Sequence, residues 1–146
     1  MIHVNVRGLI IRESENGKQL IIQLRKRAGE AEVYELPGGR INEYEKMVDG
    51  LRREIMEETG YSLNDVERVT SSFTALGFGA NCQVLFYAQI DESMKLGLGG
   101  GIDDEKIELV FIKRSEILNF IYDESKIKAP NLQFSILWWM INKNPK

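Results

Sequence analysis

The sequence of 146 residues is poor in the residue types that support disulfide, zinc and histidine chemistry. It has one cysteine, Cys82, and one histidine, His3. A single cysteine provides neither a disulfide framework nor a cysteine zinc site. His3 lies at the start of a predicted strand, so we expect catalysis to depend on carboxylates. No apolar run approaches the roughly 18 residues of a membrane span, and no basic-then-apolar signal opens the sequence. We therefore expect a cytoplasmic protein without a membrane partner.

Positive charge is not in excess either. The 22 acidic and 19 basic residues give a net charge of −3, which argues against binding to a nucleic-acid backbone. Apolar residues make up 43% and charged residues 28% of the chain, as in ordinary globular proteins. The length suits one domain over residues 1–146 with a core of its own.

The most informative segment is residues 39–61, in which glycine, glutamate and arginine recur at fixed offsets. It reads GRINEYEKMVDGLRREIMEETGY. From Glu45 to Thr59 it has no proline and Gly50 is its only glycine, which predicts a helix. Gly60 is expected to end that helix in the left-handed conformation. One apolar stripe is predicted to contain Met47, Val48, Leu51 and Ile55.

Three glutamates are expected side by side at the edge of this stripe. Glu54, Glu57 and Glu58 share a helix face because they stand at i, i+3 and i+4, and Gly50 leaves room one turn before Glu54. Like charges at this spacing repel, and Arg53 can offset only part of the repulsion through Glu57. A hard divalent cation, Mg²⁺ or Mn²⁺, is the natural partner of such carboxylates. The simpler alternative, a solvated acidic face, does not explain the glycines and arginine in register with it.

Alternating hydrophobicity and turn residues predict a fold of strands with helices on either side. An Asn16-Gly17 hairpin turn joins the first two strands, a loop from Pro37 leads to the acidic helix, and a later helix is capped by Ser115. Strands are predicted over residues 3–12, 19–26, 33–36, 66–78, 82–90 and 107–112, and further helices over 115–122 and 131–142. This order predicts an α/β sandwich.

The offsets from Gly39 to Tyr61 resemble the signature of the Nudix hydrolases, G-x5-E-x7-R-E-U-x-E-E-x-G-U, where U is a bulky apolar residue. The resemblance implies the Nudix α/β/α sandwich with a mixed β-sheet, and metal-assisted attack of water on a pyrophosphate phosphorus. It implies that Arg53 orients the helix carboxylates and that Glu45 braces the entry to the helix. It also implies a ligand set for the metal: Glu54, Glu57, Glu58 and the backbone carbonyl of Gly38.

Outside the signature, two regions are similar to segments of hydrolases of ADP-ribose and nucleotide sugars: residues 23–25 with 34–39 upstream, and residues 86–88 with 99–108 downstream. Upstream, Arg25 is suited to clamp a diphosphate, and Arg25 and Gly39 are candidate substrate-binding residues. Downstream, the glycines of residues 97–101 predict a hinge, followed by acids that can deliver a general base. Glu105 is favoured as that base, before Asp104 and Asp103. Asp104 is also a candidate substrate contact.

The leading hypothesis is therefore hydrolysis of a nucleoside diphosphate sugar, or of ADP-ribose, to a nucleoside monophosphate and a sugar phosphate. The alternative is a MutT-like nucleoside triphosphate pyrophosphohydrolase that releases pyrophosphate. A nucleotide-sensing domain is a third reading, but such domains typically lose glutamates of the signature. A homodimer remains open. The resembling sugar-nucleotide enzymes swap a β extension that precedes the first core strand, and a dimer built on it is not expected here.

Overall fold

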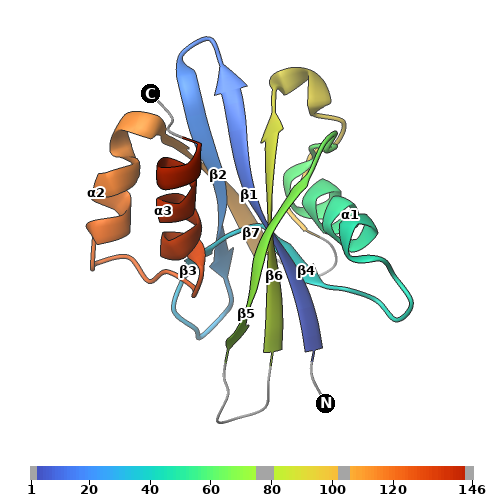
Figure 1. The fold of residues 1–146 in the computed structure, drawn as a ribbon. Helices are drawn as coiled ribbons and strands as arrows, with labels where there is room; N and C mark the ends of the chain where they lie inside the picture. Colours follow the sequence, from blue (N-terminus) through green and yellow to red (C-terminus); the bar gives the residue numbers. More distant parts are fainter. Residues whose placement is uncertain (1–2, 75–80, 102–105, 144–146) are drawn as a thin grey trace.

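Three layers make up the fold. The computed structural model describes residues 3–74, 81–101 and 106–143. Helix α1 (Met47–Thr59) covers one face of the sheet, and helices α2 (Ile117–Tyr122) and α3 (Leu132–Asn142) cover the other (Figure 1). This arrangement confirms the predicted α/β/α sandwich.

The central sheet is mixed. Its strands are β1 (His3–Ser14), β2 (Gly17–Lys26), β3 (Val33–Glu35), β4 (Gly38–Arg40), β5 (Glu67–Thr74), β6 (Asn81–Ile90) and β7 (Lys106–Lys113). Within the described part of the chain, β1 and β6 run parallel and the other pairs are antiparallel. The mixed sheet was predicted.

The two central strands β1 and β2 separate along their length, and this separation makes room for a site. They pair only from Ile10–Ile21 to Ser14–Gly17. Beyond this point β2 takes β3 as its partner, while β1 takes β4. Because β7 follows β2 along its opposite edge, β3 and β4 must lie between the diverging halves of β1 and β2. The short segment that links β3 to β4 therefore runs through the centre of the sheet.

Apolar side chains fill both faces of the sheet. On the α1 side, the buried Leu51 and Ile55 pack with Val6, Ile10 and other strand residues. On the opposite side, Trp139 of α3 belongs to a larger cluster built on β1, β2 and β6. Each fully buried side chain of this size contributes about 1.5–3 kcal/mol, so α1 is held firmly on the sheet that faces it.

Several local predictions were wrong. Residues 38–40 form strand β4 instead of a loop, because their backbone pairs with β1. Of the predicted apolar stripe, Met47 and Val48 are each 36% exposed, because the buried residues of α1 begin only at Gly50. Ser115 caps no helix: residues 114–116 form a 3₁₀ turn that leads directly into α2.

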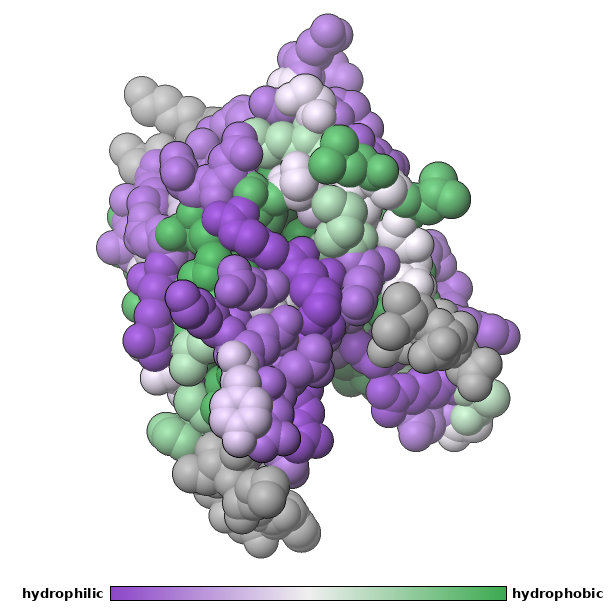
Figure 2. Space-filling model, turned by 90° about the vertical axis from the view of Figure 1, so that its right-hand side faces the viewer, coloured by the Kyte–Doolittle hydropathy of each residue, from purple (hydrophilic) through white to green (hydrophobic). Residues whose placement is uncertain are grey.

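No helix among the described residues has both the length and the apolar character needed to cross a membrane. The longest, α1, carries acidic and basic residues along its length. On the side of the molecule that carries α1, the surface is mainly hydrophilic and is hollowed by a notch at the lower edge of the view (Figure 2).

Candidate active site

A cavity of about 480 Å³ opens where β1 and β2 diverge, beside α1. Four arginines and three glutamates line it. The lining residues are Asn5, Arg7, Arg25, Arg27, Glu35, Gly38, Gly39, Arg40, Glu54 and Glu58. Because they come from four strands and one helix, the cavity depends on the sheet register described above. We call Glu54 and Glu58 the helix wall, and the four arginines with Glu35 the sheet wall.

The helix wall presses against strand β4. Glu58 is only 2% exposed, and its Oε2 accepts the backbone N–H of Gly38 at 2.8 Å. Burial raises the pKa of Glu58 to about 8, although the Gly38 N–H and Arg7 favour its charged form. A Cβ on Gly39 would lie 2.6 Å from the carboxyl carbon of Glu54. Glycine at this position thus lets the strand pass directly beside the carboxylate.

Arg53 ties the helix carboxylates to the loop that enters the helix. Its Nε and Nη2 donate to the two oxygens of Glu45 at 2.9 and 3.0 Å, and its Nη1 donates to Glu54 at 2.9 Å. The predicted pair with Glu57 forms at 3.6 Å. The hydrogen bond from Arg53 lowers the pKa of Glu45 to about 2, so Glu45 is a fixed anion. Its Oε1 also accepts the N–H of Asn42 at 2.9 Å, which braces the helix entry.

The sequence predicted that Gly50 leaves space beside Glu54. In the structure Gly50 instead leaves space for the loop that carries Glu45. A Cβ on Gly50 would lie 2.8 Å from Ile41 and 3.0 Å from Glu45 Oε1. The absence of a side chain therefore lets the entry loop pack onto α1. The packed loop places Glu45 within hydrogen-bonding distance of Arg53.

The glycine-rich segment after β6 packs on the end of α1. Gly60 ends the helix in the predicted left-handed conformation, with φ 81° and ψ 2°. Its carbonyl accepts the N–H groups of Leu96 and Gly97, and the N–H groups of Gly100 and Gly101 donate to the last carbonyls of the helix at 2.8 and 3.0 Å. Up to Gly101 this segment is therefore hydrogen-bonded to the end of α1. These contacts do not indicate the predicted hinge.

The sheet wall collects its residues from separate strands. Arg7 comes from β1, Arg25 from β2, Glu35 from β3 and Arg40 from β4, while Arg27 follows directly after β2. Glu35 Oε1 accepts from Arg25 Nε at 2.6 Å. The side chain of Arg27 is 60% exposed and stands 4.0 Å from Glu30. The wall therefore has a buried part tied by Glu35 and an open cationic rim.

Five of the predicted site residues meet at this cavity. Glu54, Glu58, Arg25, Gly38 and Gly39 line it. Two predicted residues on α1 stand beside it without lining it: Arg53 and Glu57. The predicted loop acids, Asp103, Asp104 and Glu105, lie outside the described residues, so their roles stay predictions.

Sequence reasoning missed five residues of the cavity. They are Asn5, Arg7, Arg27, Glu35 and Arg40. The available signal was charge inside otherwise apolar strands: Arg7 interrupts the core pattern of β1, and Glu35 lies in a short strand directly before Leu36 and Pro37. Such a signal marks a polar site but does not say which strands meet there.

The donor set of the helix wall fits a hard divalent cation in part. Two carboxylates, from Glu54 and Glu58, face the cavity with the backbone of Gly38, and a cation between them would offset both their repulsion and the burial of Glu58. The predicted trio is not assembled, since no three acidic, histidine or cysteine side chains among the described residues stand close enough to hold a metal ion. Arg53 engages Glu57 and Glu54 instead.

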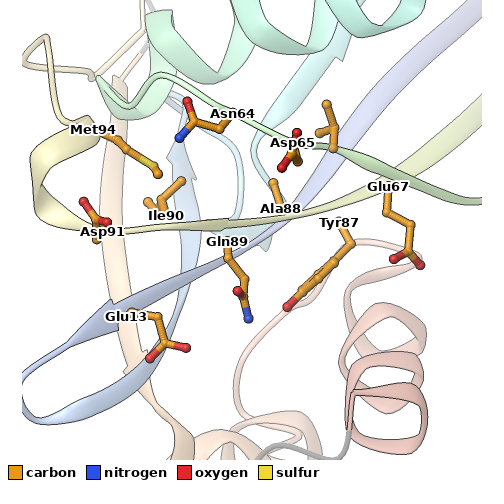
Figure 3. Close-up of a pocket in the computed structure, with 11 residues that line it drawn as sticks. Glu13, Asn64, Asp65, Glu67, Tyr87, Ala88, Gln89, Ile90, Asp91 and Met94 are labelled. Carbon is orange, nitrogen blue, oxygen red and sulfur yellow. The ribbon is translucent and has the colours of Figure 1, made fainter.

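A second cavity, of about 420 Å³, has the opposite chemistry. Its lining contains Glu13, Asp65, Glu67 and Asp91 around Tyr87, and no lysine or arginine. Figure 3 shows these carboxylates arriving from β1, from the start of β5 and from the end of β6. Glu13 and Glu67 pair with Lys18 and Lys143, which lie outside the lining, so the cavity itself offers phosphate no cationic side chain. The arginine-lined cavity is therefore the better candidate for an anionic ligand.

Comparison with known proteins points to one family. The family model described as the NUDIX domain matches residues 1–130. A GDP-mannose pyrophosphatase of Cronobacter sakazakii is 38% identical over 68 residues, which are 47% of this chain and 36% of that protein. A uridine diphosphate glucose pyrophosphatase of Bos taurus is 30% identical over 112 residues, 73% of this chain and 50% of that protein. The chain thus spans about a third to a half of the curated relatives it matches.

Solved structures show the same fold at lower identity. A NUDIX hydrolase from Nitrosomonas europaea superimposes with a TM-score of 0.71 at 19% identity, covering 98% of this chain and 91% of that one. A structure titled ADP compounds hydrolase gives 0.74 at 19% identity, covering 97% and 74%. At such identities the likeness concerns the fold alone. Since the family model matches most of the chain, the chain belongs to the Nudix family.

Proposed function

We propose that this protein hydrolyses the pyrophosphate bond of a nucleoside diphosphate sugar or of ADP-ribose, giving a nucleoside monophosphate and a sugar phosphate. The observation that carries the proposal is the pairing of two walls in one cavity. Carboxylates for a divalent cation stand on one side, and arginines for phosphate oxygens stand on the other. The relatives named GDP-mannose and uridine diphosphate glucose pyrophosphatase support a nucleotide-sugar substrate. The working unit would be a single domain over residues 1–146.

The family generally uses divalent metal cations, and Mg²⁺ or Mn²⁺ is proposed here. Glu54, Glu58 and the Gly38 carbonyl would hold the ion, joined by Glu57 once it leaves Arg53. A bound divalent cation polarises phosphoryl oxygens and acidifies a bound water. The clamp between Arg53 and Glu45 keeps the helix carboxylates in place as charge accumulates in the cavity.

The sheet wall would bind and orient the substrate. Guanidinium groups hold phosphate oxygens through charge-assisted, often bidentate, hydrogen bonds. Arg7 and Arg25 stand in the buried part of the wall, where such bonds are stronger than at the surface. Arg27 and Arg40 line the more open part, where they attract anions to the cavity.

The test is a screen of UDP-, ADP- and GDP-sugars, ADP-ribose and nucleoside triphosphates with Mg²⁺ and with Mn²⁺. Products are separated by chromatography. We expect a nucleoside monophosphate and a sugar phosphate from at least one nucleotide sugar or from ADP-ribose. Release of pyrophosphate from triphosphates, with no turnover of the sugars, would replace this proposal by the MutT-like alternative.

A further inference from the structure

Glu35 belongs to the sheet wall and contacts two of the arginines that give this wall its positive charge. It is 9% exposed. Its Oε1 accepts from Arg25 Nε at 2.6 Å and from the Gln23 amide nitrogen at 2.8 Å, and its Oε2 stands 4.0 Å from Arg7 Nη1. One carboxylate on β3 therefore connects an arginine of β1 with an arginine of β2, across the gap between those two strands.

These contacts fix how each guanidinium is held. The group is planar, so a bond at Nε together with the direction of the side chain sets the plane of the Arg25 fork. Arg7 is held from the other side, since its Nη1 donates to the carbonyls of Leu36 and Gly38 at 3.1 and 3.3 Å. The two arginines are thus held on either side of the segment that links β3 to β4, both lining the cavity.

Gln23 is not explained by stability. It is fully buried, and its Oε1 has no hydrogen-bond partner among the described residues. Turning the amide over would not help, because it would place an oxygen against the carboxylate of Glu35. An apolar side chain of the same length would avoid the unpaired oxygen. What the amide supplies at this position is a donor that holds Glu35.

We propose that Glu35 is a positioning residue, supported by Gln23, that sets Arg7 and Arg25 to bind two adjacent phosphates of the substrate. The inference rests on the proposed function and adds to it which side chains hold the two arginines in place. Two guanidinium groups held by one carboxylate suit two linked phosphates, each of which can take one guanidinium, whereas a monophosphate offers a single phosphate to the pair. Neither Glu35 nor Gln23 needs to touch the substrate.

The test compares the affinities for ADP and AMP by titration calorimetry with Mg²⁺ present. Glu35→Gln should weaken ADP binding about tenfold, the loss of roughly one charge-assisted contact, and change AMP binding less than about twofold. In steady-state assays KM should rise by a similar factor with kcat nearly constant, the signature of lost uniform binding. Glu67→Gln is the matched control, because Glu67 also pairs with a cation but lines the other cavity.

A second variant keeps the proposal falsifiable if Glu35→Gln folds poorly. Gln23→Met removes the amide at nearly constant volume. It should lower ADP affinity about threefold while its melting temperature stays level or rises, because the unpaired oxygen is gone. A purely structural amide would give the reverse, a lower melting temperature with unchanged ADP affinity.

The binding assay does not depend on turnover, so it separates this inference from the proposed function. Equal losses for ADP and AMP, or no loss in either variant, would overturn the positioning role even if a nucleotide sugar is hydrolysed. Selective loss of ADP affinity would support it even if no nucleotide sugar proves to be a substrate.

Discussion

The two walls of the cavity are built in different ways. The helix wall takes both its glutamates from one helix, where a spacing of four residues places them on one face whatever the rest of the chain does. The sheet wall takes its residues from β1, β2, β3 and β4, and one more, Arg27, from directly after β2. They meet only because β1 and β2 diverge around β3 and β4. The first wall follows from local geometry, and the second from tertiary structure.

The same difference appears in the electrostatics. On the helix wall, burial and the neighbouring carboxylate raise the pKa of Glu58, so that wall is poised to accept a cation. On the sheet wall, Glu35 is already engaged by Gln23 and Arg25. We therefore expect damage to the helix wall to affect the rate of reaction, and damage to the sheet wall to affect binding.

The largest effect should come from removing charge on the helix. Glu58→Gln and Glu57→Gln should each lower kcat by at least about 10²-fold, the scale for lost electrostatic stabilisation at a metal site. Both should fold, because each substitution removes repulsion between carboxylates. Kinetics at saturating Mg²⁺, with thermal melts alongside, measure this, and Glu67→Gln is the control. Near-normal turnover in both variants would contradict the metal assignment.

On the sheet wall, Arg25→Ala should raise KM about 10- to 100-fold, as expected for loss of one or two hydrogen bonds to a charged group. Its kcat should change far less than in the glutamate variants. Arg68→Ala, an exposed arginine on β5 outside the cavity, controls for the loss of positive charge. If Arg25→Ala lowered kcat as strongly as Glu58→Gln, the division of labour between the two walls would be wrong.

The predictability of each wall follows from its construction. The glutamates of α1, the pair of Arg53 with Glu57 and the stop at Gly60 were all predicted from the sequence, because each depends on contacts within one helix or its end. Arg7 and Glu35 were not, because they meet across 28 residues of chain through strand pairing.

Even inside the signature, tertiary contacts changed the assignment of Gly50. The sequence predicts that Gly50 leaves room for Glu54, but Ile41 and Glu45 occupy that space. Spacing along a helix gives the direction in which a position faces. It does not give the neighbour that a folded loop places there.

The pH dependence of stability separates the walls further. Glu58 has a pKa near 8 in the folded protein and 4.5 in its reference state, so its folded form holds a proton more tightly than its unfolded form. Its contribution to stability is complete below about pH 4.5 and is lost as the pH rises through about 8. We compare the melting temperatures of Glu58→Gln and of the wild type, with a chelator present. The variant's melting temperature minus that of the wild type should increase by several degrees from pH 5.5 to pH 8.5, because only the wild type loses stability.

Calorimetric or fluorescence melts at both pH values measure this difference. Adding Mg²⁺ should stabilise the wild type more at pH 8.5 than at pH 5.5, because a cation binds the ionised carboxylate. Glu67→Gln, a substitution outside the arginine-lined cavity, is the control. A constant offset between wild type and Glu58→Gln would mean that Glu58 ionises normally in the folded protein.

The smallest effect is expected where the two walls meet, at Gly39. Its Cβ would approach only the carboxylate end of Glu54, which can swing aside, so Gly39→Ala should change the melting temperature little. The displaced carboxylate should instead raise the Mg²⁺ concentration needed for half-maximal activity about two- to fivefold, which corresponds to about 0.4–1 kcal/mol.

Gly38→Ala is the informative contrast. A Cβ there would lie 2.0 Å from the backbone oxygen of Val6, at a φ of 148°, and neither backbone can yield without disturbing the pairing of β1 with β4. Gly38→Ala should therefore destabilise the fold by about 2 kcal/mol or more. If Gly39→Ala instead lowered stability as much as Gly38→Ala, with an unchanged Mg²⁺ requirement, Glu54 would be a structural part of the helix and not a ligand of the cation.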